Sequence, residues 1–348
     1  MSSQIPHRRY NPLTDEWFLV SPHRTQRPWQ GQIEKLPDEH LPEYDPTCYL
    51  CPGNKRAGDK QNPDYTETFV FENDFPALLT DIDPNTPLET GSPLLVKQVE
   101  RGFCRVICFT PRHDLTLARM SVETIRRVVD VWAEQTLDLA HYDWLHYVQI
   151  FESRGAIMGA SNPHPHGQLW ANERVPQFVE KEDRMQRLHY AKHGRTLLSD
   201  VLADEMRLNE RIVWQNDSWV VLVPFWAFWP FETLLISRRP VPFVHDLTDD
   251  ERTGLAEALS AITIRYDNVF ETSFPYGMGV HQAPVNTPNI EHWHLHLHFF
   301  PPLLRSATVR KFVASYELFA SLQRDSNPES AAERLRSLSG VHYRDQQS

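Results

Sequence analysis

The chain has 348 residues, 41% of them hydrophobic and 23% charged, which are globular values and exclude a disordered or membrane-embedded protein. Its net charge of -11 argues against general nucleic-acid binding, because that function requires a basic face. The N-terminus has no apolar signal region and no stretch of about 18 apolar residues occurs, so we expect a cytoplasmic protein without membrane contact.

The first half of the chain predicts short strands and one amphipathic helix. Alternating or apolar runs predict strands at residues 16–20, 68–71, 104–109 and 144–151. Ser121 begins the helix, because apolar residues follow it at helical spacing: Ile125, Val128, Val129 and Trp132. The last strand leads into a crowded polar segment, Ser161-Asn-Pro-His-Pro-His-Gly-Gln168, which we interpret as an active centre.

The second half repeats the order of motifs in the first. Four motifs recur: Asn73-Asp-Phe-Pro as Asn216-Asp-Ser-Trp, Ile107-Cys-Phe-Thr as Leu234-Leu-Ile-Ser, Met120-Ser-Val-Glu as Leu247-Thr-Asp-Asp, and His164-Pro-His as His294-Leu-His. We therefore expect an α+β protein with two duplicated halves, each an antiparallel sheet with packed helices. The expected domains are residues 1–178 and 179–348, joined through a charged helical stretch around 175–210.

Cys48-Tyr-Leu-Cys51 lies between prolines, a tight-loop context that suits a metal site. Four cysteines do not make a disulfide framework, and no second CxxC exists, so further ligands must come from elsewhere. His113 and His164 are the candidates, and thiolate with imidazole favours structural zinc. A redox pair or two unrelated thiols remain alternatives. Cys104 and Cys108 fit packing roles in an apolar strand.

A second histidine cluster alternates with apolar residues from His292 to His298. In one strand these histidines would share a face, which favours a metal site over a neutral hydrogen-bonded face. One strand can supply only two or three ligands to the same ion. His281 and an acidic residue such as Glu182 could complete a site, and mixed N/O ligation would suit iron or zinc.

His166, in the polar segment from Ser161 to Gln168, could act as a metal ligand, a general base or a nucleophile. Gln168 does not titrate, so its amide can donate a hydrogen bond to an anionic oxygen without delivering a proton. The small residues before it, Gly155, Gly159 and Ser161, form a loop that can approach a phosphate. We interpret the segment as a catalytic site in which His166 attacks phosphorus, while amide and hydroxyl donors stabilise the departing phosphate oxygens.

These residues resemble the galactose-1-phosphate uridylyltransferase family, the transferase branch of the histidine-triad superfamily. The resemblance rests on Gly159-Ala-Ser-Asn-Pro-His-Pro-His-Gly-Gln168, Asn73-Asp-Phe75, Arg24 with Arg27-Pro-Trp29, and Arg305-Ser-Ala-Thr-Val-Arg-Lys-Phe312. It runs from about residue 6 to the C-terminus. Ordinary histidine-triad proteins carry a third histidine where this chain has Gln168.

The resemblance implies a ping-pong reaction. His166 attacks the α-phosphorus of UDP-glucose and releases glucose-1-phosphate, and galactose-1-phosphate then takes the uridylyl group to give UDP-galactose. Ser161 and Gln168 would bind the phosphate oxygens. A non-acidic amide at position 168 would favour transfer to a sugar phosphate over hydrolysis, although water must also be excluded.

The resemblance also implies the residues around the substrate. Those of the nucleotide and phosphate side would be Arg24, Asn73, Asp74, Phe75, Val106, Ser153 and Gly159. Those of the sugar-phosphate side would be Arg27, Lys311, Tyr316, Glu317 and Gln323. Several of the latter would arrive from a second subunit, so we expect a homodimer with shared active sites.

Two metal sites follow from the same resemblance. Zinc would bind Cys48, Cys51, His113 and His164. A structural site for iron or zinc would use Glu182, His281, His296 and His298. Three departures from the family pattern are Ser153 in place of Asn, Ala160 in place of Cys, and His294, which has no metal role in the resemblance.

Two alternatives remain open from the sequence. One is a related histidine-triad enzyme, a nucleotidyltransferase with another acceptor or a dinucleoside-polyphosphate phosphorylase, which would share His166. The other is a zinc-stabilised nucleotide-binding module without catalysis, in which His166 would be dispensable.

Overall fold

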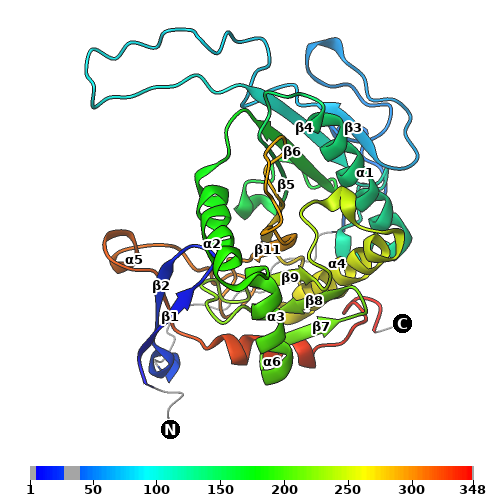
Figure 1. The fold of residues 1–348 in the computed structure, drawn as a ribbon. Helices are drawn as coiled ribbons and strands as arrows, with labels where there is room; N and C mark the ends of the chain where they lie inside the picture. The colour runs from blue at the N-terminus through cyan, green and yellow to red at the C-terminus, as the bar shows by residue number, and fades with distance from the viewer. Residues whose placement is uncertain (1–4, 27–39, 347–348) are drawn as a thin grey trace.

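The computed structural model describes residues 5–26 and 40–346. Within these ranges, nine strands form one antiparallel sheet in the order β3-β4-β6-β5-β10-β11-β9-β8-β7 (Figure 1). The strands are β3 Phe69–Glu72, β4 Gly102–Cys108, β5 Tyr147–Arg154, β6 His166–Asn172, β7 Ile212–Gln215, β8 Trp219–Leu222, β9 Thr233–Ser237, β10 Tyr276–His281 and β11 His296–Phe300. The predicted α+β class is therefore confirmed.

The long helices cover both faces of this sheet. The helices are α1 Val122–Ala140, α2 Gln177–His193, α3 Leu197–Leu208, α4 Asp249–Phe270, α5 Tyr316–Phe319 and α6 Pro328–Ser337. Side chains alternate between the two faces of each strand. On β9, Leu235 packs in the core formed with α1, α4 and α6, whereas Leu234 and Ile236 pack in the core formed with α3.

The helix starts follow from local capping. Ser121 accepts a hydrogen bond through its side chain from the backbone N–H of Thr124, as expected for an N-cap. Thr248 caps α4 with a complete capping box. Its hydroxyl accepts from the Glu251 backbone N–H, and the Glu251 carboxylate accepts from the Thr248 backbone N–H. Each repeat thus begins its longest helix with a hydroxyl side chain.

The two halves join through strands β5 and β10, which pair antiparallel in the middle of the sheet. Ile150 lies opposite Val280 in this pairing. The separation between Ile150 and Val280 in the sequence equals that between the repeated histidines His166 and His296. Ile150 and Val280 are therefore equivalent positions of the two repeats, and they pair with each other. A pseudo-twofold axis consequently runs between β5 and β10, and one sheet continues across both halves.

A smaller sheet joins the two ends of the described chain. It contains β1 His7–Asn11, β2 Glu16–Val20 and β12 Gln323–Arg324, and β12 runs parallel to β2. In Figure 1 this sheet lies beside α5, on the opposite side of the molecule from β3 and β4. A long connection between β3 and β4 loops away from the body (Figure 1).

One predicted element was wrong. The histidine run from His292 to His298 is not a single strand, because β11 begins only at His296. His292 and His294 precede it and bind other partners, described below. No helix in the described ranges is long and apolar enough to cross a membrane.

Candidate functional site

His166 is the first residue of β6 and is held by its neighbour in the motif. Its Nδ1 lies 2.7 Å from the carbonyl oxygen of His164, so Nδ1–H donates and Nε2 keeps its lone pair. Burial lowers the pKa of His166, the His164 carbonyl opposes this, and the charge of Arg154 lowers it further. A neutral imidazole with a free outer nitrogen can act as a nucleophile.

Gln168 lies on the same face of β6, two residues after His166. The Trp170 indole N–H donates to its Oε1 at 3.1 Å, which orients the amide and leaves its NH₂ group for another acceptor. The intervening Gly167 has no room for a side chain, because a Cβ there would lie 2.9 Å from the Phe109 ring. Trp170 and Arg154 could not be predicted from the polar motif, because neither belongs to it.

Strand pairing brings Val106 of β4 next to Gln168. Val106 lies directly opposite Gln168 on β6 and opposite Phe71 on β3. Directly opposed residues share a face of the sheet, so this row lines the same surface as His166. Ser153 lies farther along, on β5 opposite Gly277. Ser161 is exposed, and Gly159 has a positive φ of 88° after the short helix Ala156–Met158.

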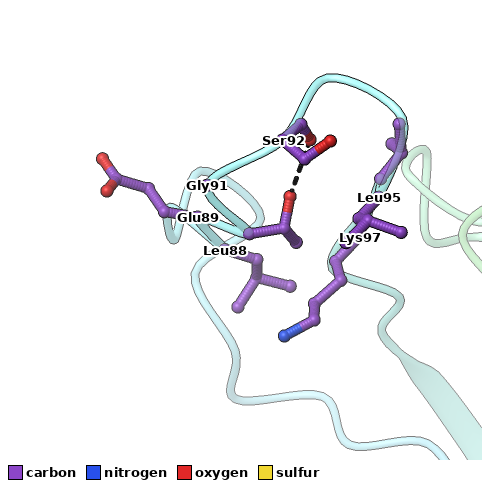
Figure 2. Close-up of a pocket in the computed structure, with 8 residues that line it drawn as sticks. Leu88, Glu89, Gly91, Ser92, Leu95 and Lys97 are labelled. Atoms are coloured by element: carbon purple, nitrogen blue, oxygen red, sulfur yellow. Dashed lines mark hydrogen bonds between the residues drawn. The ribbon is translucent and has the colours of Figure 1, made fainter.

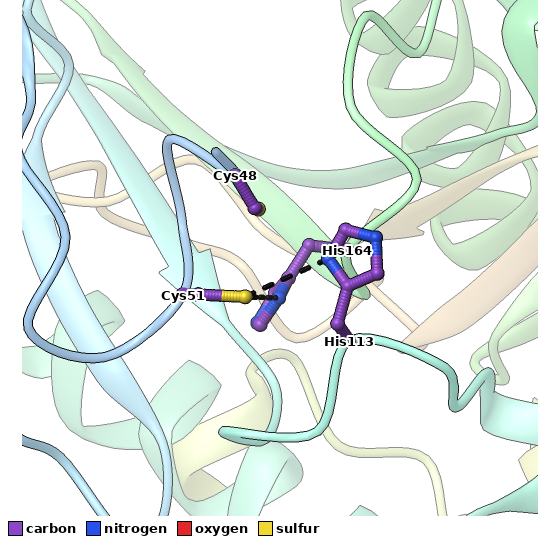
Figure 3. A group of neighbouring side chains, drawn as sticks. All are labelled: Cys48, Cys51, His113 and His164. Atoms are coloured by element: carbon purple, nitrogen blue, oxygen red, sulfur yellow. Dashed lines mark hydrogen bonds between the residues drawn. The ribbon is translucent and has the colours of Figure 1, made fainter. Parts of the chain in front are cut away.

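The four residues predicted to bind zinc come together. The ligand atoms of Cys48, Cys51, His113 and His164 all lie within 4.8 Å of one another, and all four residues are buried (Figure 3). The Cys51 Sγ atom lies 3.6 Å from Nδ1 of His113 and 3.5 Å from Nδ1 of His164. A tetrahedral zinc ion with ordinary bond lengths would separate sulfur and nitrogen by about 3.6 Å.

The surroundings of His164 fix the tautomer that a metal requires. Its Nε2–H donates to the Thr110 carbonyl at 2.9 Å, so Nδ1 presents a lone pair to Cys51. Burial lowers the pKa of His164 to about 4 and raises that of Cys51 to about 12. A neutral imidazole is ready to bind a metal, and a buried thiolate requires a cation beside it. The donor set therefore fits zinc.

The second predicted group also comes together, on the other half of the sheet. Glu182 of α2, His281 at the end of β10, and His296 and His298 of β11 are buried with their ligand atoms within 4.8 Å of one another. The Glu182 carboxylate lies 2.7 Å from Nδ1 of His281 and 3.3 Å from Nε2 of His298. Burial would raise the pKa of Glu182, but His281 and His296 hold it well below its ordinary value.

The Nε2 atom of His296 is a buried polar atom that a metal ion would satisfy. The Nδ1–H of His296 donates to the His294 carbonyl at 2.7 Å, and its Nε2 lies 3.5 Å from the Glu182 carboxylate without a hydrogen-bond partner. A metal ion between these two atoms would bind both of them. The mixed nitrogen and oxygen donors suit zinc or iron.

The two earlier histidines of this run have structural partners. The His294 Nε2–H donates to the Ser237 carbonyl at 2.6 Å, and its Nδ1 lies 2.9 Å from the hydroxyl of Thr196, the N-cap of α3. His292 lies 2.7 Å from the Asp183 carboxylate. His294 thus ties α3 to the end of β9, which gives this residue a role that the sequence did not reveal.

The predicted nucleotide residues Asn73, Asp74 and Phe75 form a turn after β3. The Asn73 side-chain oxygen accepts a hydrogen bond from the Phe75 N–H at 2.9 Å. The Phe75 ring is 78% exposed, which is unusual for a large aromatic side chain. The Asp74 side chain is only 2% exposed, so its carboxylate does not face solvent as Phe75 does.

The predicted sugar-phosphate residues gather elsewhere, beside the small sheet. Lys311 donates to the Glu317 carboxylate at 2.8 Å and to the Gln323 carbonyl at 2.7 Å. Arg24, predicted for the nucleotide side, forms an ion pair with Asp325 in this region instead, at 3.0 Å. Tyr316 opens α5 and is 56% exposed. Arg27 lies outside the described residues.

Hollows in the surface do not by themselves reveal the site. One hollow, of about 390 Å³, is lined by residues within 88–97 of the connection between β3 and β4 (Figure 2). Its lining includes none of the predicted site residues. A much smaller hollow of about 30 Å³ lies beside Lys311, Gln323 and Asp325.

Comparisons with known proteins match nearly the whole chain to one family. The family model "Galactose-1-phosphate uridyl transferase, N-terminal domain" matches residues 1–176, and the corresponding C-terminal model matches residues 182–347. The galactose-1-phosphate uridylyltransferase of Haemophilus influenzae is 54% identical over 344 residues, which cover 99% of this chain and 97% of that relative. The enzyme of the same name from Rattus norvegicus is 50% identical over 98% of this chain and 90% of the relative.

Solved structures resemble the fold. One titled "Structure of uridylyltransferase" superposes with a TM-score of 0.74 at 29% identity, covering 96% of this chain and 98% of that one. An ADP-glucose phosphorylase from Arabidopsis thaliana with bound ADP-glucose superposes with a TM-score of 0.75 at 24% identity, covering 97% of this chain and 99% of that one. The latter likeness concerns the fold alone.

Proposed function

The chain belongs to the galactose-1-phosphate uridylyltransferase family, and from this membership we propose that it transfers a uridylyl group from UDP-glucose to galactose-1-phosphate. The products are glucose-1-phosphate and UDP-galactose, and the transfer passes through a covalent uridylyl-His166 intermediate. The reaction places the enzyme in galactose metabolism. The hydrogen bond from Nδ1–H of His166 to the His164 carbonyl, which leaves the lone pair on Nε2, is the observation that carries the proposal.

In the first step, Nε2 of His166 attacks the α-phosphorus of UDP-glucose. The bond from phosphorus to the bridging oxygen breaks, and glucose-1-phosphate leaves with the electron pair. In the second step, a phosphate oxygen of galactose-1-phosphate attacks the same phosphorus and releases His166. The His164 carbonyl accepts the hydrogen bond from Nδ1–H throughout and stabilises the positive charge on the uridylylated ring.

Hydrogen-bond donors around His166 stabilise the phosphate oxygens. The NH₂ group of Gln168, oriented by Trp170, binds the α-phosphoryl oxygens. Ser161 and the backbone of Gly159 bind the phosphate that leaves. Ser153 contacts the same substrate with a shorter side chain than the family's usual Asn, so one hydrogen bond passes through water or is lost.

Both metal groups support the architecture and take no part in the transfer. Zinc would be held by Cys48, Cys51, His113 and His164. As a zinc ligand, His164 would be fixed in place, and its backbone carbonyl is the group that accepts the hydrogen bond from His166. Glu182, His281, His296 and His298 would hold iron or zinc and tie α2 to the sheet. A zinc ion bound in the first group would supply the positive charge that stabilises the buried thiolates of Cys48 and Cys51.

We also propose a homodimer that shares its active sites. The support is that Arg24, Lys311, Glu317 and Gln323 gather beside the small sheet, whereas His166 lies on β6 of the large sheet (Figure 1). The region around α5 carries exposed apolar side chains that a partner would cover: Phe312, Tyr316, Leu318 and Phe319. A second subunit would bring its sugar-phosphate residues to the His166 of the first.

Isotope exchange tests the proposed reaction. With UDP-glucose and labelled glucose-1-phosphate alone, a ping-pong enzyme incorporates label into UDP-glucose without any galactose-1-phosphate. His166→Gly should abolish both this exchange and the complete reaction while the circular dichroism spectrum stays unchanged. An active enzyme without exchange would exclude the covalent route, and exchange with ADP-glucose in place of UDP-glucose would indicate a different nucleotide substrate.

A further inference from the structure

Asp74 belongs to the turn expected to bind the nucleotide, yet its carboxylate is committed to the protein itself. Lys60 donates to Oδ1 at 2.7 Å, and the Tyr49 hydroxyl donates to Oδ2. The Nε atom of Arg56 lies 3.8 Å from the same Oδ2. All three partners come from residues 45–62, the segment that carries Cys48 and Cys51, which we call the zinc loop.

The zinc loop is a single hydrogen-bonded unit. The Asn54 side-chain amide donates to the carbonyls of Asp45 at 2.9 Å and Cys48 at 2.8 Å. The Asn62 amide donates to the carbonyls of Tyr49 at 3.0 Å and Cys51 at 2.9 Å. Tyr49 lies between the two cysteines in the sequence, so it belongs to this hydrogen-bonded unit.

The electrostatics make this attachment hard to break. Burial would raise the pKa of Asp74, but the hydrogen bonds from Lys60 and Tyr49 and the charge of Arg56 hold it below its ordinary value. The Tyr49 hydroxyl is one of the donors to this carboxylate. A buried carboxylate that loses a donor is left undersatisfied, and its backbone must shift toward water.

The same turn contains the two other residues expected to bind the nucleotide. Asn73 forms the Asx turn with Phe75, and the Phe75 ring projects into solvent. Asp74 lies between them, so its position fixes both neighbours. The Asp74 side chain therefore links the turn to the zinc loop.

We propose that Asp74 is a positioning residue that couples the zinc loop to nucleotide binding through Tyr49 and Lys60. The proposal rests on the uridylyltransferase function, because it assumes that the Asn73–Phe75 turn binds the UDP moiety. Coupling between two sites is reciprocal. UDP must then strengthen zinc binding by the same factor by which zinc strengthens UDP binding, and we expect the tighter zinc to be released more slowly.

Two measurements on the full-length holoenzyme test the coupling. The first is the dissociation constant of UDP by titration calorimetry, and the second is the rate of zinc release to a chromogenic chelator with and without saturating UDP. We expect UDP to slow release about fivefold or more in the unaltered protein. In Tyr49→Phe, UDP should bind roughly tenfold more weakly and this protection should largely disappear.

Matched variants separate the coupling from general loosening of the loop. Tyr44→Phe removes another hydroxyl of the same region, which contacts Asn54 and Pro52 and not Asp74, and should leave UDP binding unchanged. Lys60→Met removes the second donor from a half-exposed side chain, so it should fold even if Tyr49→Phe does not, and it should weaken UDP binding likewise. Equal losses of UDP affinity in Tyr44→Phe and Tyr49→Phe would overturn the coupling. Identical rates of zinc release from the unaltered protein with and without UDP would also overturn it.

The exchange assay distinguishes this proposal from the function on which it rests. A protein that exchanges glucose-1-phosphate into UDP-glucose but shows no UDP protection of its zinc overturns the coupling alone. A protein that neither exchanges nor binds UDP overturns the proposed function together with the coupling.

Discussion

His166 and His296 are held in the same way, each with its Nδ1 atom 2.7 Å from the carbonyl oxygen of the histidine two residues before it. The preceding histidines also match, because His164 donates to Thr110 and His294 donates to Ser237, at the end of the equivalent strand. One local geometry thus occurs in both halves of the sheet.

The two copies differ in what faces the free Nε2 atom. In the second half, Nε2 of His296 faces the buried Glu182 carboxylate, and Gln168 is replaced by the ligand His298. Under the proposed function, Nε2 of His166 in the first half attacks the substrate. The duplicated motif would then supply a nucleophile in one half and a metal ligand in the other.

The first prediction concerns the pH dependence of the UDP-glucose half-reaction. Burial and Arg154 lower the pKa of His166, so the neutral nucleophile persists as pH falls below the ordinary histidine value of about 6.5. We expect kcat/KM for UDP-glucose to stay constant down to about pH 6.5 and to decline only below it. UDP-glucose carries no phosphate monoester to titrate in this range. An acid limb centred above pH 6.5 would contradict the assignment.

The second prediction concerns Gln168. Gln168→His introduces a titratable donor at the α-phosphoryl oxygens, so the ratio of UDP-glucose hydrolysis to uridylyl transfer should rise about tenfold or more. Gln168→Asn keeps an amide and should leave that ratio low even if transfer slows. Product analysis with and without galactose-1-phosphate gives the ratio directly. An unchanged ratio in Gln168→His would show that the amide does not protect the intermediate.

The third prediction separates the zinc thiols from the packing thiols. Cys51→Ser should lose zinc and lower the melting temperature by roughly 5 °C or more, because a structural metal contributes directly to folding. Cys104→Ser changes a buried thiol on β4 that lies outside the cluster, so zinc content should stay at the unaltered level. Metal analysis of the purified proteins checks both. Equal zinc in Cys51→Ser and the unaltered chain would remove Cys51 from the ligand set.

The fourth prediction tests the shared active site. His166→Gly and Lys311→Ala should each be inactive alone, because one lacks the nucleophile and the other lacks a sugar-phosphate contact. In a mixed and refolded sample, half of the dimers are hybrids, and each hybrid has one intact site, so activity should return to about a quarter of the unaltered level. Absence of recovery, with hybrid dimers demonstrated by mass, would show that each site is built within one chain.

The strand and helix positions of the first half follow from local patterns, but the assembly of the sheet does not. Alternation of apolar residues predicts the two faces of β5 and β10 without saying that these strands pair with each other. The repeat suggests two halves, and only the long-range register shows that Ile150 meets Val280 across a common sheet. Pairings between residues so far apart leave no trace in periodicity.

The site divides in a similar way. The metal ligands and His166 were accessible from residue types and from the family resemblance. The partners of Asp74, the role of His294 and the help that Trp170 gives Gln168 were not, because each depends on contacts between segments far apart or on the direction of a side chain. Arg24 was assigned to the nucleotide side by resemblance, and its ion pair with Asp325 is a contact that spacing cannot reveal.

Locating the uridylyl group on the protein tests the central claim most directly. The full-length enzyme would be incubated with UDP-glucose labelled in the uracil ring without any sugar-phosphate acceptor, quenched at alkaline pH, digested and mapped by mass spectrometry. We predict that the label lies on the peptide containing His166, on the imidazole, and that galactose-1-phosphate discharges it as UDP-galactose. Label on any other residue, or no label in an enzyme that still completes the transfer, would contradict the account.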